Sequence, residues 1–455
     1  MTAADDAAYQ AYGATFVAWG GADNAAAVKR HHALGIRCTG SMWCLTAGAK
    51  LIHDDPALAD AVARDIEGKP VEVPWLFDHT YQGTKTYFGC TNHPAFREHV
   101  KREVRRVMAG GADGLHVDDH LGAAQAATAF GGGLCDHCLA AFREWLKTHA
   151  TPEELTKAGV MDLASFDYRD LIRKRARTRE EYRKVQGEIP LMDRFREFHL
   201  EAAAALVGEL REIGAQAAGH PILLSANAWV GDPRHRVVVP RLTHVVCEVE
   251  FHGREGTGKL DGAVDTFRQA RRLGKPMAIT ASGYDWAHVL DTGTVELPRF
   301  WIAFTYAHGE RFMVPHPERQ WCFDDAHGTR WYAGPPAEFA PLYRFIKESA
   351  RWLDGFEEVE DVEVEAPAGV VAVVRRDGGG RVAIHLVNRD HDAAAKRIRP
   401  AKEVAVAVPR GLIEGKKLAV IAPGVAAGPV EASMEGDRAR LQVPALAVWA
   451  IVTAE

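Results

Sequence analysis

The sequence lacks several features that would place the protein in a specialised class. No basic tract like those that grip nucleic acid interrupts its 455 residues, and the formal net charge is -6. Binding of nucleic acid is therefore not expected. No run approaches the roughly 18 apolar residues of a membrane span, so no membrane partner is expected either. The N-terminus, MTAADDAAYQ, has no basic region followed by an apolar core, so no signal peptide is visible.

Cysteine is scarce. The seven cysteines are an odd number, spread out, with only one close pair, Cys135 and Cys138. This pattern argues against a disulfide framework and favours a reducing compartment, so a cytoplasmic location is expected. The close pair offers two ligands of a zinc half-site, to which Cys90, His93 or His120 could add. Because nothing in the spacing requires an ion, free thiols are the favoured interpretation, and neither a metal nor a cofactor is predicted.

What is present is the composition of an ordinary globular protein, 47% hydrophobic and 25% charged. Short apolar runs alternate with segments of helical periodicity. Strands are expected at 14–19, 36–43, 112–120, 221–229, 243–250, 275–281 and 311–315, with a further one within 71–87. Helices are expected at 24–35, 58–64, 94–109, 135–149, 192–213, 260–273, 295–308 and 336–353.

Eight strands alternating with helices over residues 1–356 match a (β/α)₈ TIM barrel, with an insertion at about 121–200 after the fourth strand. A doubly wound open sheet is the rival, but no glycine-rich dinucleotide fingerprint follows the first strand. After residue 357 the pattern changes to strands separated by Gly, Pro and Asp turns, at 370–374, 381–387, 404–406 and 441–452. This predicts a C-terminal β-sandwich over 357–455. The sequence leaves a homo-oligomer open.

The stretch 112–120 reads as a buried strand that ends in a cluster of charged and imidazole groups. Alternate side chains of a strand point to opposite faces. If Leu115 and Val117 pack against helices, then His116, Asp118 and His120 point into the barrel. A buried carboxylate is costly unless it is paired or used, so we predict a function for Asp118. Its neighbour Asp119 is equally well explained as a cap of the next turn or helix.

Active groups of a TIM barrel lie at the carboxyl ends of its strands. Carboxylates from several strands, ringed by aromatic side chains, suit glycoside hydrolysis, which needs a carboxylic acid and a second carboxylate. The predicted substrate is therefore a carbohydrate. The candidates for contact with it are Trp19, Trp43, His79, Tyr81, His116, Asp119, His120, Asn227, Trp229, Tyr284, Asp285 and His316.

The catalytic pair is predicted by aligning residues 113–118 with residues 243–248. This alignment puts Asp118 level with Glu248, and Glu250 has the same parity one layer nearer the mouth. Asp118 is predicted to be the nucleophile, and Glu248 or Glu250 the general acid/base. A Glu among apolar neighbours has a raised pKa, as an acid needs. One of the two glutamates is expected to have a lesser role, a hydrogen bond to a substrate hydroxyl or to His252.

Four segments carry a resemblance to a known group. TNHPAFREHVKREVRRVMAGGADGLHVDD followed by LCDHCLAAFREWL resembles barrel glycoside hydrolases, including β-galactosidases with a cysteine segment after strand four, and uncharacterised glycosidases related to them. VAIHLVNRD and PALAVWAIV look like the β-sandwich of that group. Those β-galactosidases carry a Glu after strand four and another on strand seven, and this sequence has neither. Its Asp118 is more similar to α-galactosidase-like barrels, which implies an α-glycosidase or an unfamiliar linkage.

The main hypothesis is therefore a glycoside hydrolase, retaining and exo-acting. The exo preference rests on the long loops at 71–93 and 121–134, which could close one end of a cleft. A second hypothesis is a metal-dependent lyase or hydrolase that uses His116, Asp118, Asp119 and His120 as ligands. A third is a barrel that binds carbohydrate without catalysis.

Overall fold

The computed structural model describes residues 3–20, 24–42 and 45–455, and they fall into two compact units. Residues Phe16–Val246 form one unit. The N-terminal segment Met1–Thr15 joins Cys247–Glu455 in the other. The two units are described in turn. No helix among the described residues is long and apolar enough to cross a bilayer.

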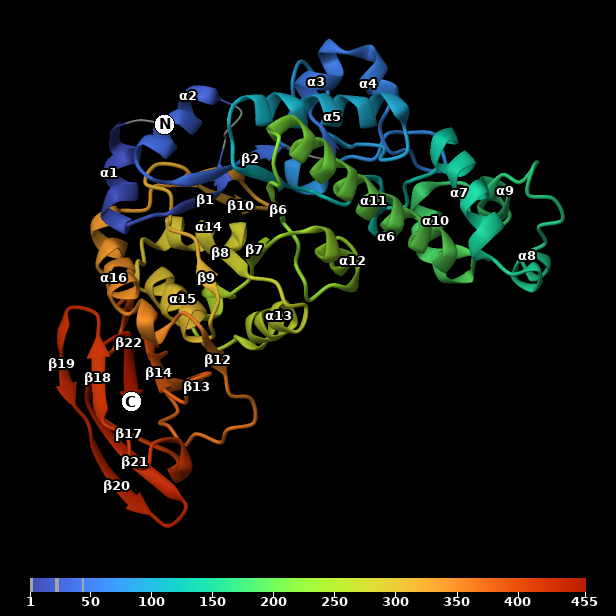
Figure 1. The fold of residues 1–455 in the computed structure, drawn as a ribbon. Coiled ribbons are helices and arrows are strands. Elements are labelled where there is room, and N and C mark those ends of the chain that lie inside the picture. Colours follow the sequence, from blue (N-terminus) through green and yellow to red (C-terminus); the bar gives the residue numbers. More distant parts are fainter. Residues whose placement is uncertain (1–2, 21–23, 43–44) are drawn as a thin grey trace. The chain divides into compact units, whose positions relative to one another are not determined.

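A parallel sheet lies at the centre of the Phe16–Val246 unit (Figure 1). Its order is β1(Phe16–Gly20), β2(Arg37–Met42), β5(Gly114–Val117) and β6(Leu223–Ala226). The expected strand within 71–87 is not part of it, because β2 pairs directly with β5. That segment instead supplies β4(Tyr87–Phe88), which runs antiparallel to β3(Thr46–Ala47). The prediction of a third barrel strand there is wrong: the segment has turn residues and no continuous apolar run.

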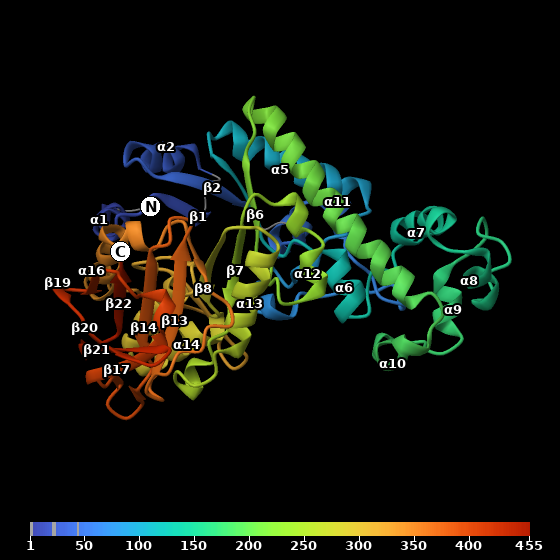
Figure 2. The same ribbon diagram turned by 60° about the horizontal axis from the view of Figure 1, so that its bottom comes forward.

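Two long helices cover one face of this sheet, α5(Pro94–Ala109) and α11(Met192–Ala218), side by side in both views (Figures 1 and 2). The apolar stripe of α5 is buried as its periodicity predicts. Leu115 points to this helical side, since a Cβ at Gly214 of α11 would lie 3.4 Å from its side chain. His116 and Asp118 therefore face the opposite side of the sheet, as predicted.

The expected insertion is helical and has a core of its own. Its helices between residues 136 and 185 gather beyond the N-terminal end of α11 (Figure 2). Within this core, Phe142 packs edge to face on both Tyr168 and Phe195. The helices of this unit not yet named are α2(Ala25–Ala33), α3(Ala49–Asp54), α4(Pro56–Asp60), α6(Ala123–Ala129), α7(Asp136–His149), α8(Pro152–Lys157), α9(Tyr168–Arg173), α10(Arg179–Val185) and α12(Pro233–Arg236).

The second unit continues the strand and helix alternation. β7(Val245–Val249), whose first two residues belong to the other unit, begins a three-stranded sheet with β8(Met277–Ala281) and β9(Arg311–Phe312). The sequence analysis predicted neither the hairpin β10(Gln320–Asp324) with β11(Gly328–Tyr332) nor the helix α14(Gly283–Thr292). The other helices are α1(Ala3–Tyr12), α13(Asp261–Arg272), α15(Glu296–Ala307) and α16(Pro336–Glu348).

The C-terminal region is a β-sandwich, as predicted. A six-stranded sheet has the order β12-β13-β14-β22-β18-β19, and a three-stranded sheet has the order β17-β21-β20. Val and Leu side chains of both sheets share one core. The strands are β12(Phe356–Glu358), β13(Val370–Asp377), β14(Val382–Asn388), β15(His391–Asp392), β16(Arg397–Ile398), β17(Ala401–Pro409), β18(Leu418–Ala422), β19(Val425–Pro429), β20(Glu431–Glu435), β21(Arg438–Leu446) and β22(Trp449–Ala454).

Candidate active site

Asp118 is the first residue beyond the carboxyl end of β5. Val117 of β5 pairs with Ala226 of β6, so Asp118 and Asn227 follow side by side at the edge of the sheet. The Asn227 Nδ2 donates a hydrogen bond of 3.1 Å to Asp118 Oδ1, and the backbone N–H of Asp119 donates one of 3.0 Å to the same oxygen. Burial raises the pKa of Asp118, and these two bonds oppose the rise. The carboxylate is therefore held in one orientation at a partly buried strand end.

His116 lies one layer below Asp118 and is fully buried. Its Nδ1 is 3.0 Å from the hydroxyl of Ser225, which pairs with it across the β5–β6 ladder. The indole of Trp19 lies 4.6 Å away, measured between ring centroids. Burial, with a smaller contribution from His244, lowers the pKa of His116 to about 3, so its imidazole is neutral. The structure thus brings together Trp19, His116, Asp118 and Asn227, four of the predicted site residues.

His120 is buried against a histidine that the sequence analysis did not single out. Its ring meets that of His235 edge to face at 4.9 Å, and both imidazoles lie near the backbone of Asn227. Burial lowers the pKa of both histidines, that of His235 to about 4. His235 follows a turn after β6, and no sequence pattern points from there to His120.

The ligand atoms of His116, Asp118, Asp119 and His120 do not converge on one point. Among the described residues, only two groups of three or more ligand atoms lie within 4.8 Å of one another, and they are Cys90, Cys135 and Cys138, and His32, Cys38 and Asp113. Asp119 has a left-handed φ of 44° and accepts the N–H of Gly122 at 3.1 Å, so it opens the turn before α6. This geometry gives no support to the metal-ligand hypothesis for the 116–120 segment.

The remaining candidates of this unit lie on surface segments. The Trp229 side chain, three residues after β6, is 50% exposed. The ring of Tyr81 contacts that of His53 at 5.2 Å and the ammonium of Lys50 at 4.9 Å, and His79 Nε2 lies 3.8 Å from a carboxylate oxygen of Asp78. His79 and Tyr81 thus have contacts with their own neighbourhood. Trp43 lies outside the described residues.

The alignment that put Asp118 level with Glu248 is wrong. A parallel bridge joins Asn227 to Val246, so Val246 is the residue in register with Asn227 and Asp118. The alignment is two residues out, because it assumed that the two segments start level, whereas the pairing through β6 staggers them. Glu248 still faces the same side of the sheet as Val246, because it follows Val246 by two residues.

Glu248 and Glu250 differ in their surroundings. Glu248 lies on β7 and is partly buried between Cys247 and Val249, which are both buried. Glu250 is the first residue after the strand, and its side chain is 55% exposed. Glu250 Oε1 lies 3.3 Å from Nδ1 of His252, the contact expected for the glutamate with the lesser role. These surroundings favour Glu248 as the acid/base.

Tyr284 and Asp285 lie in the first turn of α14, not in the open segment predicted after β8. The Tyr284 hydroxyl donates to a carboxylate oxygen of Asp325 at 3.0 Å, and its ring is 40% exposed. Asp285 is buried, and its carboxylate accepts the backbone N–H groups of Phe251 and Gly253 at 2.7 and 2.6 Å. Asp285 therefore fixes the loop that follows Glu250, which is a positioning role, whereas Tyr284 is open to a ligand.

His316 is held by its own segment. Its Nδ1 accepts the backbone N–H groups of Glu318 and Arg319 at 3.1 and 2.9 Å, and its Nε2 lies 3.9 Å from a carboxylate oxygen of Asp5 on α1. Burial lowers the pKa of His316. These contacts tie the segment after β9 to the N-terminal helix.

Comparisons with known proteins give one set of relatives by sequence and another by structure. No family model matches the chain. The chain is 21% identical over 298 residues to an alpha-agarase of Alteromonas agarilytica, a match that covers 64% of this chain and 20% of the relative. The chain thus spans about one fifth of that relative's length. This relative is not a β- or α-galactosidase, so the finer resemblance to those enzymes gains no support from it.

Two solved structures share the fold at low identity. A cycloisomaltooligosaccharide glucanotransferase of Paenibacillus sp. superposes with a TM-score of 0.60 at 9% identity, covering 94% of this chain and 74% of the other. Alpha-L-fucosidase isoenzyme 2 of Paenibacillus thiaminolyticus gives 0.56 at 12% identity, covering 99% and 95%. Together with the sheets described above, these likenesses establish the predicted fold class, a (β/α)₈-type barrel with a C-terminal β-sandwich.

Proposed function

We propose that the chain is a glycoside hydrolase in which Asp118 is the nucleophile. The observation that carries the proposal is the Asp118 carboxylate, partly buried at a strand end and oriented by Asn227. In barrels of this fold, the carboxyl ends of the strands are where reacting groups lie. The sequence similarity to an alpha-agarase supports the same class of reaction.

The reaction proposed is a double displacement with retention of configuration. Asp118 attacks the anomeric carbon while Glu248 protonates the departing glycosidic oxygen, which leaves a glycosyl ester on Asp118. Glu248, now ionised, takes a proton from water as the water attacks the same carbon and frees Asp118. Separations of about 5–5.5 Å between the two carboxyl groups are typical of retaining enzymes. The exo-acting preference remains part of the proposal.

The substrate proposed is an α-linked carbohydrate. Agarose and its oligosaccharides are the first to test, because the relative by sequence is an alpha-agarase. The half-exposed indole of Trp229 offers a flat apolar face to a sugar ring beyond the end of β6. The neutral imidazole of His116 and the amide of Asn227 are groups that can hydrogen-bond hydroxyls.

The experiment is a panel of agarose, agaro-oligosaccharides and aryl α- and β-glycosides, with wild type beside Asp118→Asn. The substitution suits this use because an amide oxygen at residue 118 can keep both hydrogen bonds that Oδ1 accepts. Release of product from one anomeric series, lost in the folded variant, supports the proposal. Binding of saccharides with no product over long incubation would instead identify a carbohydrate-binding barrel, and equal turnover by both proteins would remove Asp118 from the chemistry.

A further inference from the structure

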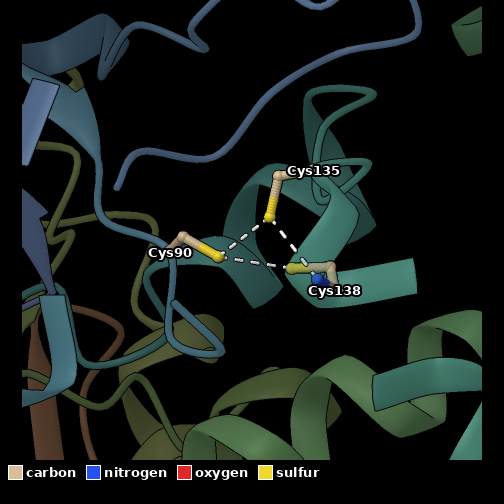
Figure 3. A group of neighbouring side chains, drawn as sticks. All are labelled: Cys90, Cys135 and Cys138. Atoms are coloured by element: carbon tan, nitrogen blue, oxygen red, sulfur yellow. Dashed lines mark hydrogen bonds between the residues drawn. The ribbon is translucent and has the colours of Figure 1, made fainter. Parts of the chain in front are cut away.

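Three cysteines from distant parts of the sequence meet in the Phe16–Val246 unit. The Cys90 Sγ lies 3.2 Å from that of Cys135 and 3.4 Å from that of Cys138 (Figure 3). All three side chains are buried, and they pack on one another as a cluster separate from the neighbouring apolar cores. Cys90 comes from the segment before α5, and the other two from the first turn of α7.

N–H groups face two of the three sulfurs. Cys135 is the N-cap of α7, and its Sγ accepts the backbone N–H of Cys138 at 3.5 Å. The Asn92 Nδ2 donates to the Sγ of Cys138, also at 3.5 Å. A helix N-terminus and N–H donors both stabilise a negatively charged sulfur. Three buried thiolates at these distances would repel one another, and a bound cation would offset both that repulsion and the cost of burying the charges.

We propose that Cys90, Cys135 and Cys138 bind one zinc ion through three thiolates. Their ligand atoms are the only cysteine trio among the described residues to lie within 4.8 Å of one another. Zinc takes soft thiolates at about 2.3 Å in a tetrahedron, which sets the sulfurs about 3.8 Å apart. The sulfurs at 3.2 and 3.4 Å reach that spacing by moving outward by roughly half an ångström, within the reach of small rotations about the Cα–Cβ bonds.

The fourth position of the tetrahedron is assigned to water. No other His, Cys, Asp or Glu in the described part of the chain completes the group at this geometry. Binding releases the three thiol protons to solvent, and the bound ion joins the segment before α5 to the start of the helical insertion. The function of the site is structural, and no step of the glycoside chemistry passes through it.

The first test is the metal content of the full-length protein, purified without chelator and measured by mass spectrometry. The proposal predicts one zinc ion per chain. A mercurial reagent that blocks the three thiols should release this ion, and a chromogenic chelator would detect it. Cys90→Ser, Cys135→Ser and Cys138→Ser should each lose the ion. Cys322→Ser is the matched control, because Cys322 is a buried free cysteine of β10, outside the cluster, and this variant should keep the zinc.

A second readout does not depend on the folding of the variants. Replacement of the ion by Co²⁺ in the wild-type protein should give the intense visible bands of tetrahedral thiolate coordination. Wild type that takes up neither zinc nor Co²⁺ would overturn the proposal. So would zinc retained in Cys135→Ser, or a disulfide joining any two of the three cysteines in protein purified under non-reducing conditions.

Discussion

The hydrogen bond from Asn227 to Asp118 allows the role of Asp118 to be tested without touching the carboxylate. In Asn227→Ala, Oδ1 loses the 3.1 Å bond and keeps the one from the backbone of Asp119. A hydrogen bond to a charged group contributes about 1.5–3 kcal/mol, and this bond favours the ionised form. Since 1.36 kcal/mol is a tenfold change in proton affinity, Asp118 of the variant should bind its proton roughly 10- to 100-fold more tightly.

The assay is the pH dependence of kcat/KM, whose acid limb reports a group that must be ionised in the free enzyme. A nucleophilic Asp118 is active only as the carboxylate, so the acid limb should move to higher pH in Asn227→Ala. Ser225→Ala is the matched control from the same strand end, because it removes a bond to His116 instead. Acid limbs that coincide in wild type and Asn227→Ala would refute the reasoning.

Three further predictions concern the acid, the core and the stability profile. Glu248→Gln should lower kcat by at least about 100-fold on substrates with poor leaving groups, which is the usual contribution of a general acid. Glu250→Gln removes an exposed partner of His252 and should lower kcat by less than about tenfold. The reverse order of effects in steady-state kinetics would exchange the roles of the two glutamates. Trp286→Ala should destabilise the protein by about 3–5 kcal/mol in urea unfolding, because the indole is fully buried and its Nε1 donates to Thr280 at 2.9 Å. Replacement of the half-exposed Trp229 by Ala should lower the free energy of unfolding by no more than about 0.5 kcal/mol. Burial raises the pKa of Glu310 from 4.5 to about 7, so the unfolded chain loses this proton first as the pH rises. Relative to Glu310→Gln, the stability of wild type should therefore fall by roughly 1–3 kcal/mol between about pH 4.5 and about pH 7 and stay level above that range. Parallel stability profiles of the two proteins would contradict this.

The elements with a clear period were predictable from the sequence. The helix 94–109 was predicted with the bounds that the structure has, because its apolar residues recur at helical spacing and Pro94 occupies its first position. The strand parity at 115–118 followed from alternation alone. The strand within 71–87 failed because its aromatic and polar residues have no such pattern, and β2 pairs directly with β5.

Contacts between distant segments could not be predicted from the sequence, whereas the start of α14 could have been. Ser282 caps α14 and its hydroxyl bonds to Asp285 three residues on, a capping pattern visible in Ser-Gly-Tyr-Asp. The bonds from the backbone of Phe251 and Gly253 to that Asp285 depend on tertiary structure. The same holds for the approach of Cys90 to the two cysteines of α7. The domain boundary at 356, the homo-oligomer and the cytoplasmic location stay predictions.

The nucleophile itself is tested most directly by chemical rescue. Asp118→Gly removes the carboxylate and leaves a space that a small anion can enter, so azide can attack the anomeric carbon in its place. The account predicts that the folded variant is inactive on an aryl glycoside that wild type cleaves. Added azide should restore aglycone release and yield a glycosyl azide of inverted configuration. Turnover of that substrate by Asp118→Gly at the wild-type rate without azide would contradict the central claim that Asp118 performs the displacement.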